Sequence, residues 1–88
     1  MGNEEFLRRC KEKVRDYFNS HADKSEGFLP IGTENVYVVW SCKALQNNKA
    51  LLSTDIPDGM YYECTYNGDK KEMYFDAYKK WENICFRF

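Results

Sequence analysis

MYYECTYNGDKKEMYFDAYK, residues 60–79, contains two tyrosine-rich runs on either side of the turn-forming residues 67–70. Aromatic residues favour strands and Asn-Gly favours a tight turn, so the stretch predicts an antiparallel hairpin. We expect Tyr66 to face Lys71 across the turn. In that register Cys64 lies opposite Met73, and Tyr62 lies opposite Phe75.

The predicted hairpin has two different faces, because side chains alternate along a strand. One face is apolar and carries Met60, Tyr62, Cys64, Met73 and Phe75. The other face mixes tyrosines with acids and carries Tyr61, Glu63, Tyr74, Asp76 and Tyr78. We expect the apolar face to receive a helix and the mixed face to remain in solvent.

The outward tyrosine and acid row has two interpretations, and the residues leave both open. Tyrosine is a good strand former that is often half-buried on the outer face of a sheet. It is also enriched at protein interfaces, because it offers a large contact area and a hydroxyl group. The candidate partner-binding residues are Tyr61, Glu63, Tyr74, Asp76, Tyr78 and, as secondary candidates, Trp81 and Trp40.

Two further strands are predicted before this hairpin, over residues 36–45 and 49–56, where β-branched and aromatic residues are frequent. Asn47-Asn48 is expected to form the turn between them, and residues 57–59 (PDG) the next turn. Trp40 shares a strand face with Val38 and Cys42, which favours a core position. Residues 78–88 fit either a helical stripe or a strand, and their β-forming residues favour a strand or an extended edge segment.

Residues 3–20 are predicted to be an amphipathic helix with Asn3 as its N-cap. Phe6, Cys10, Val14 and Tyr17 recur at helical spacing and form an apolar stripe. The remaining helix surface is rich in Arg and Lys, which is typical of a solvated face and also of a membrane or nucleic-acid contact.

The connection over residues 19–35 lacks periodicity, and its apolar residues Phe28, Leu29 and Ile31 are expected to attach it to the sheet edge. The chain therefore predicts one α+β domain over residues 1–88, in which the helix packs on an antiparallel meander of about four strands.

Composition disfavours several functions. The 13 basic and 14 acidic residues nearly cancel, whereas a nonspecific duplex-DNA binder carries a positive excess. Tyr37 and the outward tyrosines could stack single-stranded bases, but the acids among them would repel phosphates. No secretion signal or membrane span is read, so the cytoplasm is the expected location.

Catalytic and metal sites are also disfavoured. No nucleotide-binding, hydrolase or metalloprotease motif is present, and the single histidine, His21, is expected in a loop just after the helix. Cys10, Cys42, Cys64 and Cys85 lack the close pair typical of structural zinc, which favours free thiols packed in the core. We expect no enzymatic activity, no metal and no cofactor.

The segments VVWSCKALQNNKALLST (38–54) and DGMYYECTYNGDKKEMYFDAYKKWEN (58–83) resemble a family of small uncharacterised proteins. Members of that family are encoded by phages and prophages of low-GC Gram-positive bacteria. The resemblance implies a protein made in the bacterial host cytoplasm, and it carries over no catalytic or binding residue. Small accessory proteins of this kind frequently bind host factors, including defence systems.

The expected function is therefore that of a non-enzymatic phage accessory protein that binds a host protein and inhibits a host or defence factor. Self-association into a homodimer, through the open sheet face or the edge formed by the C-terminal segment, is an alternative. A binder of a nucleotide, another small molecule or a single-stranded oligonucleotide is a second hypothesis, and it predicts a basic pocket. A minor virion or assembly protein is a third.

Overall fold

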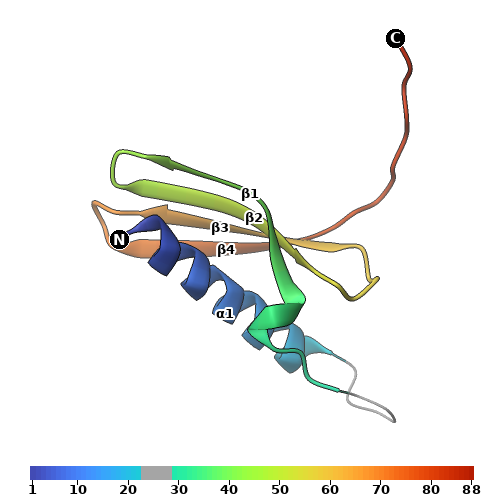
Figure 1. Ribbon diagram of the computed structural model, residues 1–88, viewed down its shortest axis with the longest axis horizontal. Coiled ribbons are helices and arrows are strands. Elements are labelled where there is room, and N and C mark those ends of the chain that lie inside the picture. Colours follow the sequence, from blue (N-terminus) through green and yellow to red (C-terminus); the bar gives the residue numbers. More distant parts are fainter. Residues whose placement is uncertain (23–28) are drawn as a thin grey trace.

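The computed structural model describes residues 1–22 and 29–88, and it consists of one helix and one four-stranded sheet. The elements are α1 (Asn3–His21), a short 3₁₀ helix η1 (Thr33–Asn35), β1 (Val36–Ala44), β2 (Asn47–Thr54), β3 (Met60–Asn67) and β4 (Glu72–Lys79). The strands form an antiparallel meander in the order β1-β2-β3-β4. Helix α1 lies on one face of this sheet (Figure 1), which confirms the predicted α+β fold.

The hydrophobic core lies between α1 and the sheet. Phe6, Cys10 and Val14 are fully buried, as the helical spacing predicted, while Tyr17 is partly buried beside them. The sheet contributes Ala50 and Leu52 from β2, and Tyr62, Cys64 and Tyr66 from β3. Burying large apolar side chains is the main source of stability in so small a domain.

Both ends of α1 differ in detail from the predicted helix. The helix begins at Asn3, with Gly2 rather than Asn3 in the capping position and no side-chain cap. After the helix, the Asn19 amide donates to the Ile31 carbonyl at 3.0 Å and accepts from its N–H at 2.9 Å. Ile31 is buried as expected, whereas Leu29 is exposed. Phe28 lies outside the described residues.

The turn between β1 and β2 differs from the prediction. Leu45 and Gln46 form it, with Leu45 at a φ of 55°, and Asn47 and Asn48 are the first residues of β2. Asn47 instead connects the two hairpins, because its side-chain oxygen accepts a hydrogen bond from the Gly68 N–H at 3.1 Å. A side chain at Gly68 would collide with the Gln46 carbonyl, so glycine is required for this close approach.

The predicted register of the last hairpin is wrong by one residue on each strand. Asn67, rather than Tyr66, closes the turn opposite Glu72, and Cys64 faces Phe75. Asn67 stabilises the shifted turn by accepting hydrogen bonds from the backbone N–H groups of Asp69 and Lys70. Because each strand position now pairs two residues further along, every side chain keeps its predicted face.

Residues 80–88 are not part of the sheet. Strand β4 ends at Lys79, and no secondary structure is assigned from Lys80 onwards. We call residues 80–88 the tail. It runs from the end of β4 away from the helix and the sheet (Figure 1). The sheet-edge segment predicted over residues 78–88 is therefore wrong beyond Lys79.

Candidate protein-binding face of the sheet

The face of the sheet opposite α1 has no helix over it in the described part of the chain (Figure 1). We call it the open face. Its large side chains come from all four strands and are Tyr37, Val39, Trp40, Leu51, Tyr61, Tyr74 and Tyr78. A single sheet covered on one side leaves such a row in water unless another molecule covers it.

The candidate residues of β3 and β4 lie side by side on this face, in other pairs than the predicted register gave. Tyr61 lies opposite Tyr78, and Glu63 lies opposite Asp76. Tyr74, on the other side of Asp76, lies opposite Thr65. The structure therefore brings together the five primary candidates. Trp81 is separate from them, because it belongs to the tail and is 93% exposed.

Trp40 is a member of the open face that the sequence placed in the core. A β-bulge interrupts the pairing of β1 with β2 between Val38 and Trp40, so that Val38 faces Leu52 but Trp40 faces Leu51. The extra residue transfers Trp40 to the opposite face, where it is 44% exposed. Alternation alone could not reveal this, because no residue in the run marks the position of the bulge.

Charge is unevenly distributed over the open face. The paired carboxylates Glu63 and Asp76 lie on β3 and β4, and Glu63 forms an ion pair with Lys49 at 3.4 Å. Trp40, Val39 and Leu51 lie on the β1–β2 side. The face thus offers an apolar half and an acidic, tyrosine-rich half, which suits a partner surface that combines apolar with basic side chains.

Tyr74 is held at the edge of this acidic half. Its hydroxyl donates to the Glu72 carboxylate at 2.6 Å, and this hydrogen bond raises the pKa of Tyr74. The phenol therefore stays protonated at neutral pH and its ring direction is restrained. A restrained aromatic side chain loses less conformational entropy when a partner contacts it.

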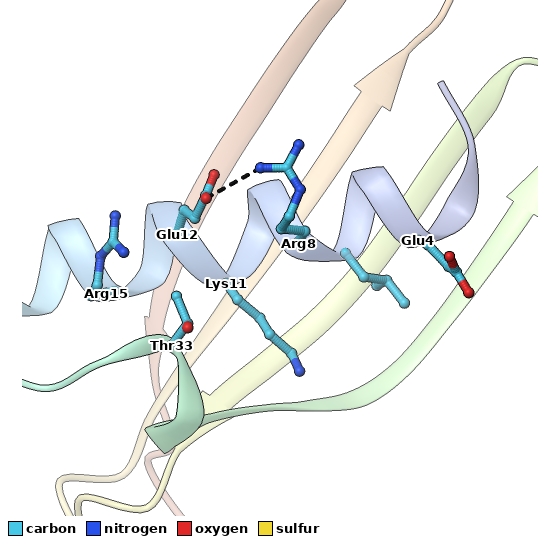
Figure 2. Close-up of a pocket in the computed structure, with 7 residues that line it drawn as sticks. Glu4, Arg8, Lys11, Glu12, Arg15 and Thr33 are labelled. Carbon is cyan, nitrogen blue, oxygen red and sulfur yellow. Dashed lines mark hydrogen bonds and ion pairs between the residues drawn. The ribbon is translucent and has the colours of Figure 1, made fainter.

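One cleft lies elsewhere, along the solvent side of α1. It encloses about 490 Å³ and is lined by Glu4, Leu7, Arg8, Lys11, Glu12, Arg15 and Thr33. Figure 2 shows the Arg8 side chain directed at Glu12, an ion pair of 3.3 Å, whereas Lys11 extends away from both. Its charges largely neutralise one another, so the cleft offers little attraction to a charged ligand.

A second cleft, of about 350 Å³, lies between α1 and the β3–β4 hairpin. Its lining contains three cationic side chains, Arg9, Lys13 and Lys71, beside Met1, Tyr66 and Met73. Arg9 pairs with Glu5 at 3.1 Å, but none of the lining residues is a carboxylate. We call it the cationic cleft. Its charge suits a small anion with an apolar part.

A family model matches residues 7–88, nearly the whole chain, and its description is a family of unknown function, DUF6275. The chain belongs to this family. No curated protein and no solved structure matches it. The family therefore adds no site residue to those that the geometry brings together.

Other features of this DUF6275 member bear on the remaining predictions. Within residues 1–22 and 29–88, no cluster of three or more metal-ligating side chains occurs, and no helix is long and apolar enough to cross a membrane. Cys10 and Cys64 are buried in the core as expected. Cys42 and Cys85 are exposed, because the bulge turns Cys42 outward and Cys85 lies in the tail.

His21 and the two buried thiols have different surroundings. His21 is the last residue of α1, and its ring stacks on Tyr17 with a centroid distance of 4.0 Å. Cys10 donates a hydrogen bond to Cys64, and this bond, together with burial, raises the pKa of Cys10, while it lowers the pKa of Cys64. The Cys10 thiol thus stays protonated, whereas a nucleophilic cysteine needs its thiolate form.

Proposed function

We propose that this protein is a non-enzymatic binding protein that uses the open face to hold a protein partner. The observation that supports this most directly is the row of exposed aromatic residues beside the paired carboxylates Glu63 and Asp76. Tyrosine and tryptophan on a rigid sheet supply contact area at low entropic cost. The partner surface would combine apolar side chains with Arg or Lys.

The biological setting of the proposal follows from the sequence resemblance. The protein would be a phage or prophage accessory protein, made in the cytoplasm of a low-GC Gram-positive host. Its partner would be a host protein, and occupying that protein would inhibit a host or defence function. The near-zero net charge agrees with a protein partner better than with a nucleic acid.

Affinity capture from host lysate tests this proposal, with two matched variants of the tagged protein. The triple variant Tyr61→Ser, Tyr74→Ser, Tyr78→Ser removes three rings from the open face. The control Lys13→Ser, Lys71→Ser changes exposed residues of the cationic cleft instead. We expect the tyrosine variant to lose a stoichiometric host partner and the control to retain it, with circular dichroism showing that both are folded.

The acidic half of the open face provides a second readout. Asp76→Asn should weaken capture, and the loss should shrink at high ionic strength, because the proposed contact is with basic groups. A host protein that both the tyrosine variant and the control retain equally would refute the open face as the binding site.

Binding of a nucleotide or another small organic anion is a second candidate, and the three cations of the cationic cleft favour it. Calorimetric titration with mono-, di- and cyclic nucleotides tests it. Here Lys13→Ser, Lys71→Ser should abolish binding. The tyrosine variant is now the control and should retain it. Tryptophan fluorescence is a poor probe, since neither Trp40 nor Trp81 lines the cleft.

A further inference from the structure

The tail carries apolar side chains that nothing in the described structure covers. Trp81, Ile84 and Phe86 are 93%, 58% and 74% exposed, and the tail runs away from the body of the domain (Figure 1). An exposed run of this kind is unfavourable in water and favours association. The question is which surface it fits.

The two edges of the sheet differ in their ability to accept another strand. β1 is an edge strand that contains the bulge between Val38 and Trp40, and bulges protect edges from pairing. β4 is the other edge, and its eight residues pair with β3 without interruption. The regular edge of β4 is therefore the better template, and the tail continues directly from it.

The backbone of β4 determines which residues can form a new ladder. Lys80 N–H donates to the Gly59 carbonyl at 2.7 Å, on the β3 side. Because backbone groups alternate in direction along a strand, the N–H and C=O groups of odd-numbered residues, such as Phe75, Ala77 and Lys79, point to the free edge. If the tail continues as a strand, its odd-numbered residues point to that edge too.

The same parity places the apolar tail residues on the open face. Tyr74 and Tyr78 are even-numbered and face outward, away from α1. Ile84 and Phe86 are also even-numbered. As a continuation of β4 the tail would extend the aromatic row of the open face, and it would leave Cys85 and Arg87 on the other side.

We propose that β4 and the tail of one copy pair antiparallel with β4 and the tail of a second copy, about a two-fold axis at Trp81. Each tail then lies along the free edge of β4 in the other copy, and the two sheets become one. Such an interface is closed and self-complementary, as two-fold symmetry requires. It goes beyond the proposed host-protein binding and does not depend on it.

Charge distinguishes this register from its two nearest alternatives. Only registers that pair odd-numbered with odd-numbered residues use the free backbone groups of both copies. With Trp81 opposite its own copy on the axis, Lys80 faces Glu82 of the other chain, and the contact occurs twice. Moving the register by one residue on each strand would place Lys80 opposite Lys80, or Glu82 opposite Glu82, and like charges directly opposite are unfavourable.

The side chains brought together in this register are compatible. Tyr78 faces Ile84 of the second copy, and Phe86 faces Asp76, with the exposed ring of Tyr74 diagonally beside it. Aromatic and β-branched neighbours stabilise such pairs. The open faces of the two copies would form one continuous surface, with twice the number of aromatic side chains.

Light scattering coupled to size exclusion, run over a range of concentrations, tests the proposal on the full chain. We expect a dimer. Phe86→Asp, together with Ile84→Asp, should make the protein monomeric with an unchanged circular dichroism spectrum, because both residues lie outside the folded body. A chain that is monomeric even at millimolar concentration, or a dimer that this variant retains, would overturn the proposal.

A charge exchange tests the register. Lys80→Glu creates two Glu–Glu contacts and should weaken the dimer by roughly tenfold. Adding Glu82→Lys restores opposite charges and should return the dissociation constant to near that of the unmodified protein. A double variant as weak as the single one would contradict pairing at Trp81.

The test of the dimer and the test of host-protein capture can succeed or fail independently. The monomeric tail variant keeps Tyr61, Tyr74 and Tyr78, so its capture of a host protein can be measured in the absence of the dimer. Capture by the monomer with no dimer in the unmodified chain would refute the self-association and support the open face. A dimer without any captured protein would do the reverse.

Discussion

The covered and open faces of the sheet place the same residue type in opposite environments. Tyr62 on β3 is 1% exposed beneath α1, whereas Tyr78 on β4 is 50% exposed on the open face. Both belong to regular strands of one hairpin. What separates them is their position in the strand alternation relative to the helix. Tyrosine content alone therefore says nothing about whether a strand builds a core or an interface.

The neighbours of the two rings show what this difference means for stability. Tyr62 packs against Tyr17 and Phe75, with ring centroids 5.7 Å away in both cases. Tyr78 has Tyr61 opposite it and solvent above it. The covered face holds the helix to the sheet, so the open face is free to carry residues chosen for contact with another molecule.

The largest expected difference in the free energy of unfolding is between variants of Phe6 and of Tyr78. Phe6 is fully buried in the core, so Phe6→Ala should lower the free energy of unfolding by about 3–4 kcal/mol. Tyr78→Ala leaves no enclosed cavity and should cost less than about 1 kcal/mol. Urea unfolding of the two variants measures both values. Similar losses would mean that the open face is covered in solution, for example by a second copy.

Alkaline pH should lower the free energy of unfolding through the ionisation of buried Tyr62, by less than the loss expected for Phe6→Ala. Burial, with a smaller contribution from the charge of Asp58, raises the pKa of Tyr62 to about 12. An unfolded tyrosine has a pKa near 10, so the folded state favours the protonated phenol. This stabilisation is complete below about pH 10 and is lost as the pH rises through about 12, a change of about 3 kcal/mol.

Tyr62→Phe removes this ionisation, and Tyr78→Phe is the matched control. The free energy of unfolding of the Tyr62 variant should fall less steeply between pH 9 and pH 11.5, a range that brackets the start of the transition at about pH 10. The control should keep the slope of the unmodified protein. Identical slopes for all three proteins would show that the Tyr62 hydroxyl reaches water.

The assignment of strand residues to the covered or the open face could largely be predicted from sequence, because side chains alternate between the two faces along a strand. The helical stripe and the alternation in residues 60–79 assigned Phe6, Tyr62 and Cys64 to the core and five tyrosine and acid positions to the open face. The error of one residue on each strand in the hairpin register left these assignments intact, since moving both strands preserves the faces.

The features that sequence missed are those in which one residue is added or a turn is displaced. The bulge moves Trp40 and Cys42 outward without any residue that marks it. The first turn uses Leu45 and Gln46 although Asn47-Asn48 is the better turn pair by composition. Contacts between the two hairpins decide this, and they bring together residues that are far apart in the chain.

The displaced turn leaves Asn48 as a buried polar residue without hydrogen-bond partners on the covered face. Asn48 is 2% exposed, opposite Tyr66 of β3, and within the described residues neither polar atom of its amide has a hydrogen-bond partner. A buried amide without partners is destabilising by about 1–3 kcal/mol. The covered face thus tolerates a cost that the open face, exposed to water, would not impose.

Asn48→Val should therefore raise the free energy of unfolding, by about 1 kcal/mol, because it removes the unpaired amide and introduces a good strand former of similar size. Asn48→Asp, which buries a charge at the same place, should instead destabilise the protein. Urea unfolding of the two variants measures both signs. If Asn48→Val is less stable than the unmodified protein, the amide has a partner in solution, and the covered face is less strictly apolar than its packing indicates.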